Sequence, residues 1–202
     1  MSAVITSPED IVNIALRRIG YKIRVGSLMD GSMAASVALD LFGQTRDEML
    51  RSGDYRFAQW TAPAVVQKTA PPNYFDTPWT TAFPQLPWKF QVEYPSDCLK
   101  VRAIKPLPGF LFDPLPVENL FTEANDDTST PPRKCILLNV ENALIVYTRQ
   151  VLEPATWDVD FVEALAATLS KKFIPQLANL QTANLAVRDE AVAVATAANT
   201  QG

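Results

Sequence analysis

The sequence predicts an α+β protein in which a four-helix bundle carries an inserted, small antiparallel β domain, either a barrel or a sandwich. Two shifts in composition along the 202 residues lead to this prediction. Thirteen of the sixteen prolines lie in residues 61–150, whereas residues 155–198 hold twelve alanines and only Pro175. Because proline is rare inside helices, we expect helices at both ends and β structure between them. The predicted domains are 1–60 with 151–202 for the bundle, and 61–150 for the β insertion.

The first helix is expected to begin at Pro8. Ser7 is a good N-cap, and proline is favoured at the first helical position. Gly20 is expected to end the helix. Apolar residues fall at helical spacing between these limits: Ile11, Ile14, Ala15 and Ile19.

A turn-rich link over residues 26–31 leads to a longer second helix. Asp30 or Ser32 is expected to cap its start, and Gly53 its end. One face of this helix is apolar and small. Its members are Ala34, Ala35, Ala38, Leu41, Phe42, Thr45, Met49 and Leu50.

Short segments rich in β-branched and aromatic residues follow, each bounded by Pro, Asn or Asp. They predict strands over 64–68, 88–93, 99–104, 136–139 and 144–150, with a hairpin turn at 139–142. Residues 70–87 and 125–132 are proline-rich and polar, which indicates long loops at the edge of the sheet.

A third helix is expected from Asp158, because an apolar stripe with helical spacing follows it and Lys171 and Lys172 suit its C-terminal dipole. Pro175 is expected to end or kink this helix. The stripe consists of Phe161, Val162, Leu165, Leu169 and Phe173. Residues 180–198 predict a fourth helix that is rich in Ala and Val but weakly amphipathic. If the helices pack together, the junctions near Trp60 and Gln150 must lie close in space.

Composition excludes several classes of function. The net charge of -4 is unfavourable for a protein that binds the phosphate backbone of nucleic acids. The absence of histidine removes the usual general base, the commonest metal ligand and the Ser-His and Cys-His pairs. Two cysteines, Cys98 and Cys135, make neither a zinc site nor a disulfide framework, and we expect both to be buried. No apolar run is long enough to span a membrane and no secretory signal is visible, so we expect a cytosol-like compartment.

Two acidic clusters are candidates for a metal or catalytic site. Glu123, Asp126 and Asp127 offer hard oxygen ligands for magnesium or calcium, but the ligand spacing of a calcium loop is missing, which favours a solvated loop. Asp158 and Asp160, with Glu163, offer paired carboxylates for acid-base chemistry. Carboxylates in the first turn of a helix are, however, expected because they interact favourably with the positive end of the helix dipole. Neither cluster predicts a metal, cofactor or catalytic site.

Aromatic residues gather on the predicted loop and the strand after it: Trp79, Phe83, Trp88 and Phe90. On a basic surface they would suggest base stacking, but charge is sparse here and core or interface aromatics are favoured. No glycine-rich phosphate loop or acyl-transfer motif occurs. The residues alone therefore predict a non-catalytic interaction or structural protein, not an enzyme.

Four stretches together resemble a known family. The first is Asn13–Gly20, which ends in Ile-Gly, and the second is Arg46–Leu50 followed by Asp54–Ala58, which lacks the usual His-Pro-Trp. The third is Tyr94–Val101, which contains Asp-Cys-Leu-Lys-Val. The fourth is Leu144–Leu169, which contains Tyr147, Arg149, Trp157, Asp158, Phe161, Ala164 and Leu165. In order and spacing they resemble the head-to-tail adaptor family of tailed bacteriophages, the group that includes tail tubular proteins.

The resemblance implies a virion structural protein at the head-tail junction, made in the host cytoplasm. About twelve copies would form a ring that binds the portal protein on one side and a tail nozzle or stopper on the other. Double-stranded DNA would pass through its channel without sequence-specific binding, and a lumen that is not basic would not retain it. No membrane or cofactor is implied.

The resemblance also implies interface residues. The C-terminal segment would dock on the portal through Leu185, Val187, Arg188, Val192 and Val194. Trp79 and Phe83 would contact a neighbouring subunit or the tail. Two other readings stay open: a β-module with helical flanks that binds nucleic acid or a peptide through the 79–90 aromatics, and an enzyme with a carboxylate site around residues 123–127.

Overall fold

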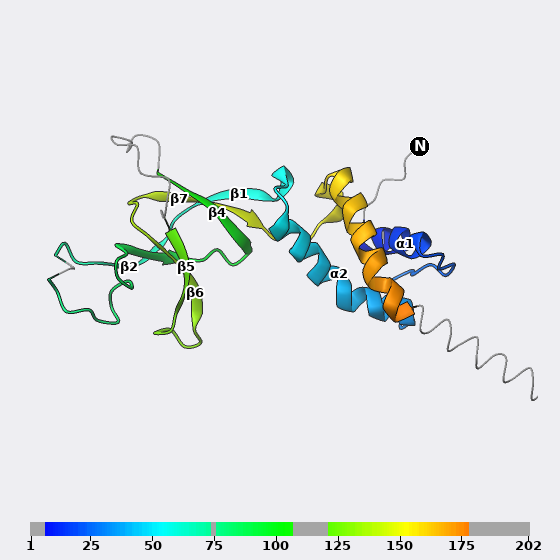
Figure 1. Ribbon diagram of the computed structural model, residues 1–202, viewed down its shortest axis with the longest axis horizontal. Helices are drawn as coiled ribbons and strands as arrows, with labels where there is room; N and C mark the ends of the chain where they lie inside the picture. The colour runs from blue at the N-terminus through cyan, green and yellow to red at the C-terminus, as the bar shows by residue number, and fades with distance from the viewer. Residues whose placement is uncertain (1–6, 74–75, 107–120, 178–202) are drawn as a thin grey trace, which may run out of the picture. The chain divides into compact units, whose positions relative to one another are not determined.

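The computed structural model of the protein describes residues 7–73, 76–106 and 121–177. The chain divides into two units (Figure 1). The helical unit comprises Met1–Ser52 and Val151–Gly202, and the β unit comprises Gly53–Gln150. The sequence prediction placed the first boundary at residue 60, whereas the units divide between Ser52 and Gly53.

Three described helices make up the helical unit: α1 (Pro8–Arg18), α2 (Met33–Ser52) and a third helix over residues 159–177, preceded by the short η2 (Pro154–Thr156). The Asp10 amide donates to Ser7 Oγ at 3.2 Å, so Ser7 caps α1. The Ala35 amide donates to Ser32 Oγ at 3.2 Å, so of the two candidate caps it is Ser32 that opens α2. Gly20 has a φ of +75°, a conformation that glycine adopts without strain after a helix.

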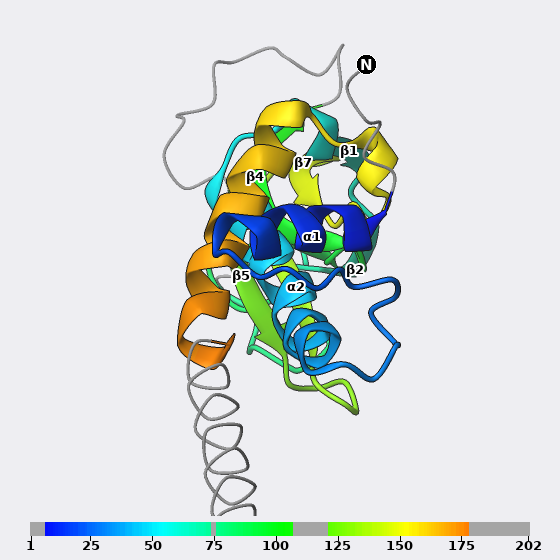
Figure 2. The same ribbon diagram turned by 90° about the vertical axis from the view of Figure 1, so that its right-hand side faces the viewer.

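The three helices bury their apolar faces against one another (Figure 2). On the third helix the predicted stripe is buried throughout, with Phe161 and Phe173 fully inaccessible. This helix continues through Pro175 to residue 177, and Leu177 is 2% exposed. Buried side chains on both sides of Pro175 hold the turn in place although proline removes one backbone hydrogen bond.

The four-helix bundle predicted from the sequence is wrong. The described residues contain three helices and two antiparallel sheets, which make a mixed α+β structure. The fourth helix was predicted from residues 180–198, which lie outside the described residues. That prediction depended on composition without an apolar stripe, and composition alone gives a helix no face to pack.

The β unit contains two antiparallel sheets. The three-stranded sheet has the order β1–β7–β4, formed by Gln59–Pro63, Ala143–Arg149 and Cys98–Pro106. The four-stranded sheet has the order β2–β3–β6–β5, formed by Val66–Thr69, Phe90–Glu93, Arg133–Leu138 and Phe121–Asp126. A short η1 (Arg56–Ala58) precedes β1.

Both sheets contribute to one core, so each has an apolar face. The three-stranded sheet supplies Val101, Ile104, Ala143, Ile145 and Tyr147, and the four-stranded sheet supplies Val92, Ile136 and Leu138. Gln59 pairs with Thr148, so the first and last strands of the unit are neighbours (Figure 1).

Sequence reasoning missed β1 and β5. Both are edge strands with mostly exposed or half-exposed residues, so neither has the apolar pattern of a buried strand.

Candidate functional site

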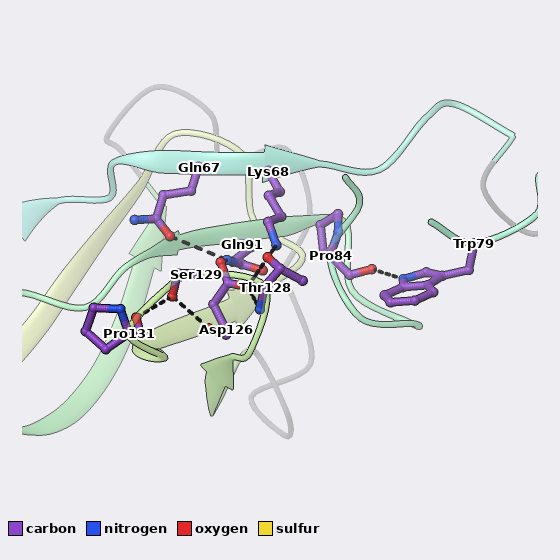
Figure 3. A network of polar contacts seen from close by, with 9 residues as sticks. All are labelled: Gln67, Lys68, Trp79, Pro84, Gln91, Asp126, Thr128, Ser129 and Pro131. Atoms are coloured by element: carbon purple, nitrogen blue, oxygen red, sulfur yellow. Dashed lines mark hydrogen bonds and ion pairs between the residues drawn. The ribbon is translucent and has the colours of Figure 1, made fainter. Parts of the chain in front are cut away.

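Asp126, from the acidic cluster that was expected to lie in a solvated loop, is the centre of a structural network (Figure 3). Asp126, at the end of β5, accepts hydrogen bonds from Lys68 Nζ at 3.0 Å, Gln91 Nε2 at 2.8 Å and Thr128 Oγ1 at 2.5 Å. The Thr128 hydroxyl, and then Lys68 and Gln91, hold the pKa of this carboxyl well below its usual range. Its two carboxylate oxygens are therefore occupied by the chain's own donors.

The same network joins strands of the four-stranded sheet. Lys68 lies on β2, Gln91 on β3 and Asp126 on β5. Ser129 Oγ donates to the Asp126 carbonyl at 2.8 Å, and so orders the turn after β5. Among the residues that the structure describes, no group of three or more His, Cys, Asp or Glu side chains is placed to hold a metal ion. Of these carboxylates, Asp126 thus stabilises the sheet and its turn, whereas Glu123 and Asp127 are exposed.

The thiols are poorly suited to chemistry. Cys135 is buried as expected, but Cys98 is only half-buried. Burial raises the pKa of both thiols, and nearby carboxylates add to the effect. A protonated thiol is a weak nucleophile, so neither cysteine is activated.

Trp79 and Phe83, the predicted subunit or tail contacts, lie on the loop between β2 and β3. Trp79 Nε1 donates to the buried Pro84 carbonyl at 2.9 Å, while the side chain stays 48% exposed (Figure 3). Phe83 is half-buried, and its amide donates to the Thr80 carbonyl at 3.0 Å. The indole is anchored at its polar edge while its ring stays half exposed.

A hollow of about 360 Å³ opens beside the turn before β4. Lys134 Nζ lies 5.3 Å from the centroid of the Tyr94 ring within it, a cation–π contact. Its lining carries both signs of charge: Gln67, Glu93, Tyr94, Pro95, Ser96, Cys98, Arg133 and Lys134. The mixed charge gives this hollow no preference for an anion or a cation.

The stretch Tyr94–Val101 forms a turn that is tied to the end of β7. The Tyr147 hydroxyl donates to Asp97 Oδ1 at 3.0 Å, and the Gln150 amide donates to the Asp97 carbonyl at 2.7 Å. Asp97 thus holds the start of β4 against the end of β7, so its position in the motif has a structural reason.

The stretch Leu144–Leu169 leads out of β7 into the third helix. Its Trp157 is 7% exposed, with its ring centroid 5.2 Å from that of Phe161 in a T-shaped arrangement. On its other side the Trp157 ring stacks on Phe42 of α2, with centroids 6.3 Å apart. These aromatic contacts join the third helix to α2.

The stretch Asn13–Gly20 includes a buried amide. Asn13 Nδ2 donates to the Val25 carbonyl at 2.9 Å, and the Val25 amide donates to Asn13 Oδ1 at 2.9 Å. The Asn13 side chain therefore satisfies both backbone hydrogen-bonding groups of Val25 in the α1–α2 loop.

Sequence reasoning missed one exposed aromatic. Trp60 marked a predicted boundary, but it lies on β1, is 50% exposed, and has the Arg149 guanidinium 4.7 Å from its ring centroid. The pairing of Gln59 with Thr148 brings these residues together, and no local pattern signals it.

The predicted portal contacts lie outside the described residues: Leu185, Val187, Arg188, Val192 and Val194. In the described ranges, no helix is both long and apolar enough to cross a membrane. No family model matches the chain, and a search of curated proteins found no match either.

Proposed function

We propose that the protein is a non-catalytic structural component of a tailed bacteriophage. It is an adaptor that forms a ring between the portal and the next tail component and leaves an axial channel for DNA. The proposal starts from the resemblance of four stretches to the head-to-tail adaptor family.

One observation carries the proposal: the residues that make the resemblance also make contacts on which the two units depend. Asp97 bonds to Tyr147 and Gln150 in the β unit, and Trp157 packs between Phe42 and Phe161 in the helical unit. Residues that serve a common fold are expected to recur in the same order and spacing.

The surface offers what a protein that works through contacts requires. Large apolar side chains are exposed on both units, and such residues are a common feature of interfaces. Those of the helical unit are Ile23, Met29, Met33, Leu39, Leu152, Val159 and Ile174, and those of the β unit are Trp60, Val65, Val66, Trp79 and Leu86. The net charge of -4 disfavours retention of DNA in a channel.

The test is to mix the full chain with the portal protein encoded in the same genome and to image the mixture by negative-stain electron microscopy. We expect a second ring stacked on the portal ring, with an open axial hole. The portal alone and the chain alone are the controls. Portal rings without added density would overturn the proposal.

A titration with a fluorescent oligonucleotide separates the alternative function. A nucleic-acid module would bind tightly at low salt and lose affinity as salt rises. The adaptor is expected to give no saturable binding. Saturable, salt-sensitive binding together with a failure to decorate the portal would favour the module.

A further inference from the structure

An exposed, charged segment of the α1–α2 loop is held in a fixed conformation. Ile23 is 66% exposed, and Lys22 and Arg24 on either side of it are also exposed. The next residue, Val25, is 2% exposed and is bound through both its backbone groups by Asn13. The loop therefore presents its basic-apolar-basic segment without further ordering, which lowers the entropic cost of binding a partner.

A second exposed segment has the same form and the opposite charge. Val159 is 74% exposed, between the exposed Asp158 and Asp160. The buried Trp157 and Phe161 flank this segment, and their aromatic contact fixes its two ends. The segment therefore presents an acidic-apolar-acidic surface that is as well ordered as the loop.

The charges of both segments are available to a partner. Within the part of the chain that the structure describes, none of their four charged side chains forms an ion pair, whereas nearby Arg18 and Glu163 pair with each other. Figure 2 shows the loop after α1 and the start of the third helix at separate places on the helical unit.

We propose that the Lys22–Arg24 segment of one copy docks on the Asp158–Asp160 segment of a second copy. Ile23 and Val159 would pack at the centre, with the two pairs of opposite charges around them, an arrangement of apolar core and polar rim. The occupant is a second copy because charge complementarity to the loop is found on the chain itself.

Such a contact joins unlike faces, so every copy keeps one free face of each kind. Contacts of this type build a ring when the rotation between copies closes, and an open filament when it does not. The inference deepens the proposed function by naming the faces between ring neighbours. It depends on that function for ring closure but not for the contact itself.

The experiment uses charge reversal in the full chain. The loop variant carries Lys22→Glu and Arg24→Glu, and the helix variant carries Asp158→Lys and Asp160→Lys. Sedimentation velocity measures self-association up to about 0.5 mM, where even a millimolar contact is detectable. Lys171→Glu, which reverses another exposed charge of the same unit, is the matched control, and circular dichroism checks that each variant folds.

The wild type and the control are expected to associate, and more weakly as NaCl rises from about 50 to about 500 mM. Each variant alone is expected to associate at least about 10-fold more weakly than the wild type, because like charges then meet. An equimolar mixture of the two variants should recover association, since each supplies the charge that the other lacks. A monomeric wild type, variants that associate as the wild type does, or a mixture that fails to recover would each overturn the contact.

The portal experiment distinguishes this inference from the proposed function. Rings that form on the portal with both variants would leave the adaptor function standing and remove this contact. Association that follows the charge pattern, with no portal binding, would support the contact and remove the adaptor function.

Discussion

The hydroxyl of Tyr147, in the middle of the core face of β7, donates a hydrogen bond of 3.0 Å to the Asp97 carboxylate at the start of β4. Asp97 also accepts from the Gln150 amide through its carbonyl at 2.7 Å. The turn before β4 and the last residues of the β unit are thus held by one residue.

Alkaline unfolding should depend on Tyr147. Burial, and then the neighbouring Asp97, raise its pKa to about 12, from an ordinary value near 10. The unfolded chain therefore loses this proton first, so the contribution of Tyr147 is complete below about pH 10 and declines as pH rises to about 12. We expect Tyr147→Phe to flatten the fall in stability over this range, measured by urea unfolding at a series of pH values.

At neutral pH, Tyr147→Phe should cost about 1 to 2 kcal/mol, because the Asp97 carboxylate loses a hydrogen bond. Tyr21→Phe is the control, since the Tyr21 hydroxyl has no hydrogen bond within the described residues. Equal losses for the two variants would contradict the role of the bond.

Acid unfolding should depend on Asp126. Its folded pKa is held below the usual range by Thr128, Lys68 and Gln91. Its contribution to stability is therefore present above about pH 4 and is lost as pH falls further. Asp126→Asn should lower stability at pH 7 by about 1 to 2 kcal/mol and reduce the loss on acidification.

Asp127→Asn removes a neighbouring exposed carboxylate and is the matched control for this experiment. It should shift the unfolding midpoint little. The same acid profile in both variants would refute the network as the source of the pH dependence.

The aromatic contact between Trp157 and Phe161 should dominate the stability of the helical unit. Phe161 is fully buried, so Phe161→Ala should cost about 3 to 5 kcal/mol, from lost burial and the cavity that remains. Ile174→Ala on the same helix removes a side chain that is 51% exposed and should cost about 0.5 kcal/mol or less. Chemical unfolding of both variants tests this difference, and similar costs would mean that Phe161 is not in the core.

Asn13 should contribute more to the free energy of unfolding than its small side chain suggests. Asn13→Ala removes two hydrogen bonds and leaves both backbone groups of the buried Val25 without this partner. We expect a loss of about 2 kcal/mol or more, together with faster hydrogen exchange at the Val25 amide. An unchanged exchange rate at Val25 would show that the loop is held by other contacts.

The helices were predictable from the sequence because their signals are local. Ser7 with Pro8 at the start of α1, and the stripe from Phe161 to Phe173, each identify an element by spacing and capping alone. The strand β1 was missed because its partner β7 lies far along the chain, and β5, although it pairs with the nearby β6, was missed because its own residues are exposed or half-buried. The end of α2 at Gly53 was predicted, but the division of the chain into units there was not, because η1 and the exposed strand β1 that follow have no strong local pattern.

The same distinction between local signals and long-range contacts applies to the candidate sites. Sequence reasoning favoured a solvated loop for the 123–127 carboxylates, whereas Asp126 is bonded by the nearby Thr128 and by Lys68 of β2 and Gln91 of β3, which lie more than thirty residues away. Trp79 was identified from its aromatic neighbours, whereas its anchor at Pro84 depends on the fold of the loop. The charged segment at 22–24 had no signal by itself, and Asp158 and Asp160 were explained by the positive helix terminus, because the complementarity of the two segments appears only when they are compared.

The insertion of the β unit also sets the order in which the protein can fold during synthesis. Glu48 on α2 and Lys172 on the third helix form an ion pair of 2.7 Å across 124 residues of sequence. Every residue of the β unit emerges from the ribosome before the third helix does, so that unit can begin to fold while α1 and α2 still lack their partner. The apolar faces of the first two helices are exposed during this interval, which makes the nascent helical half a natural client for chaperones.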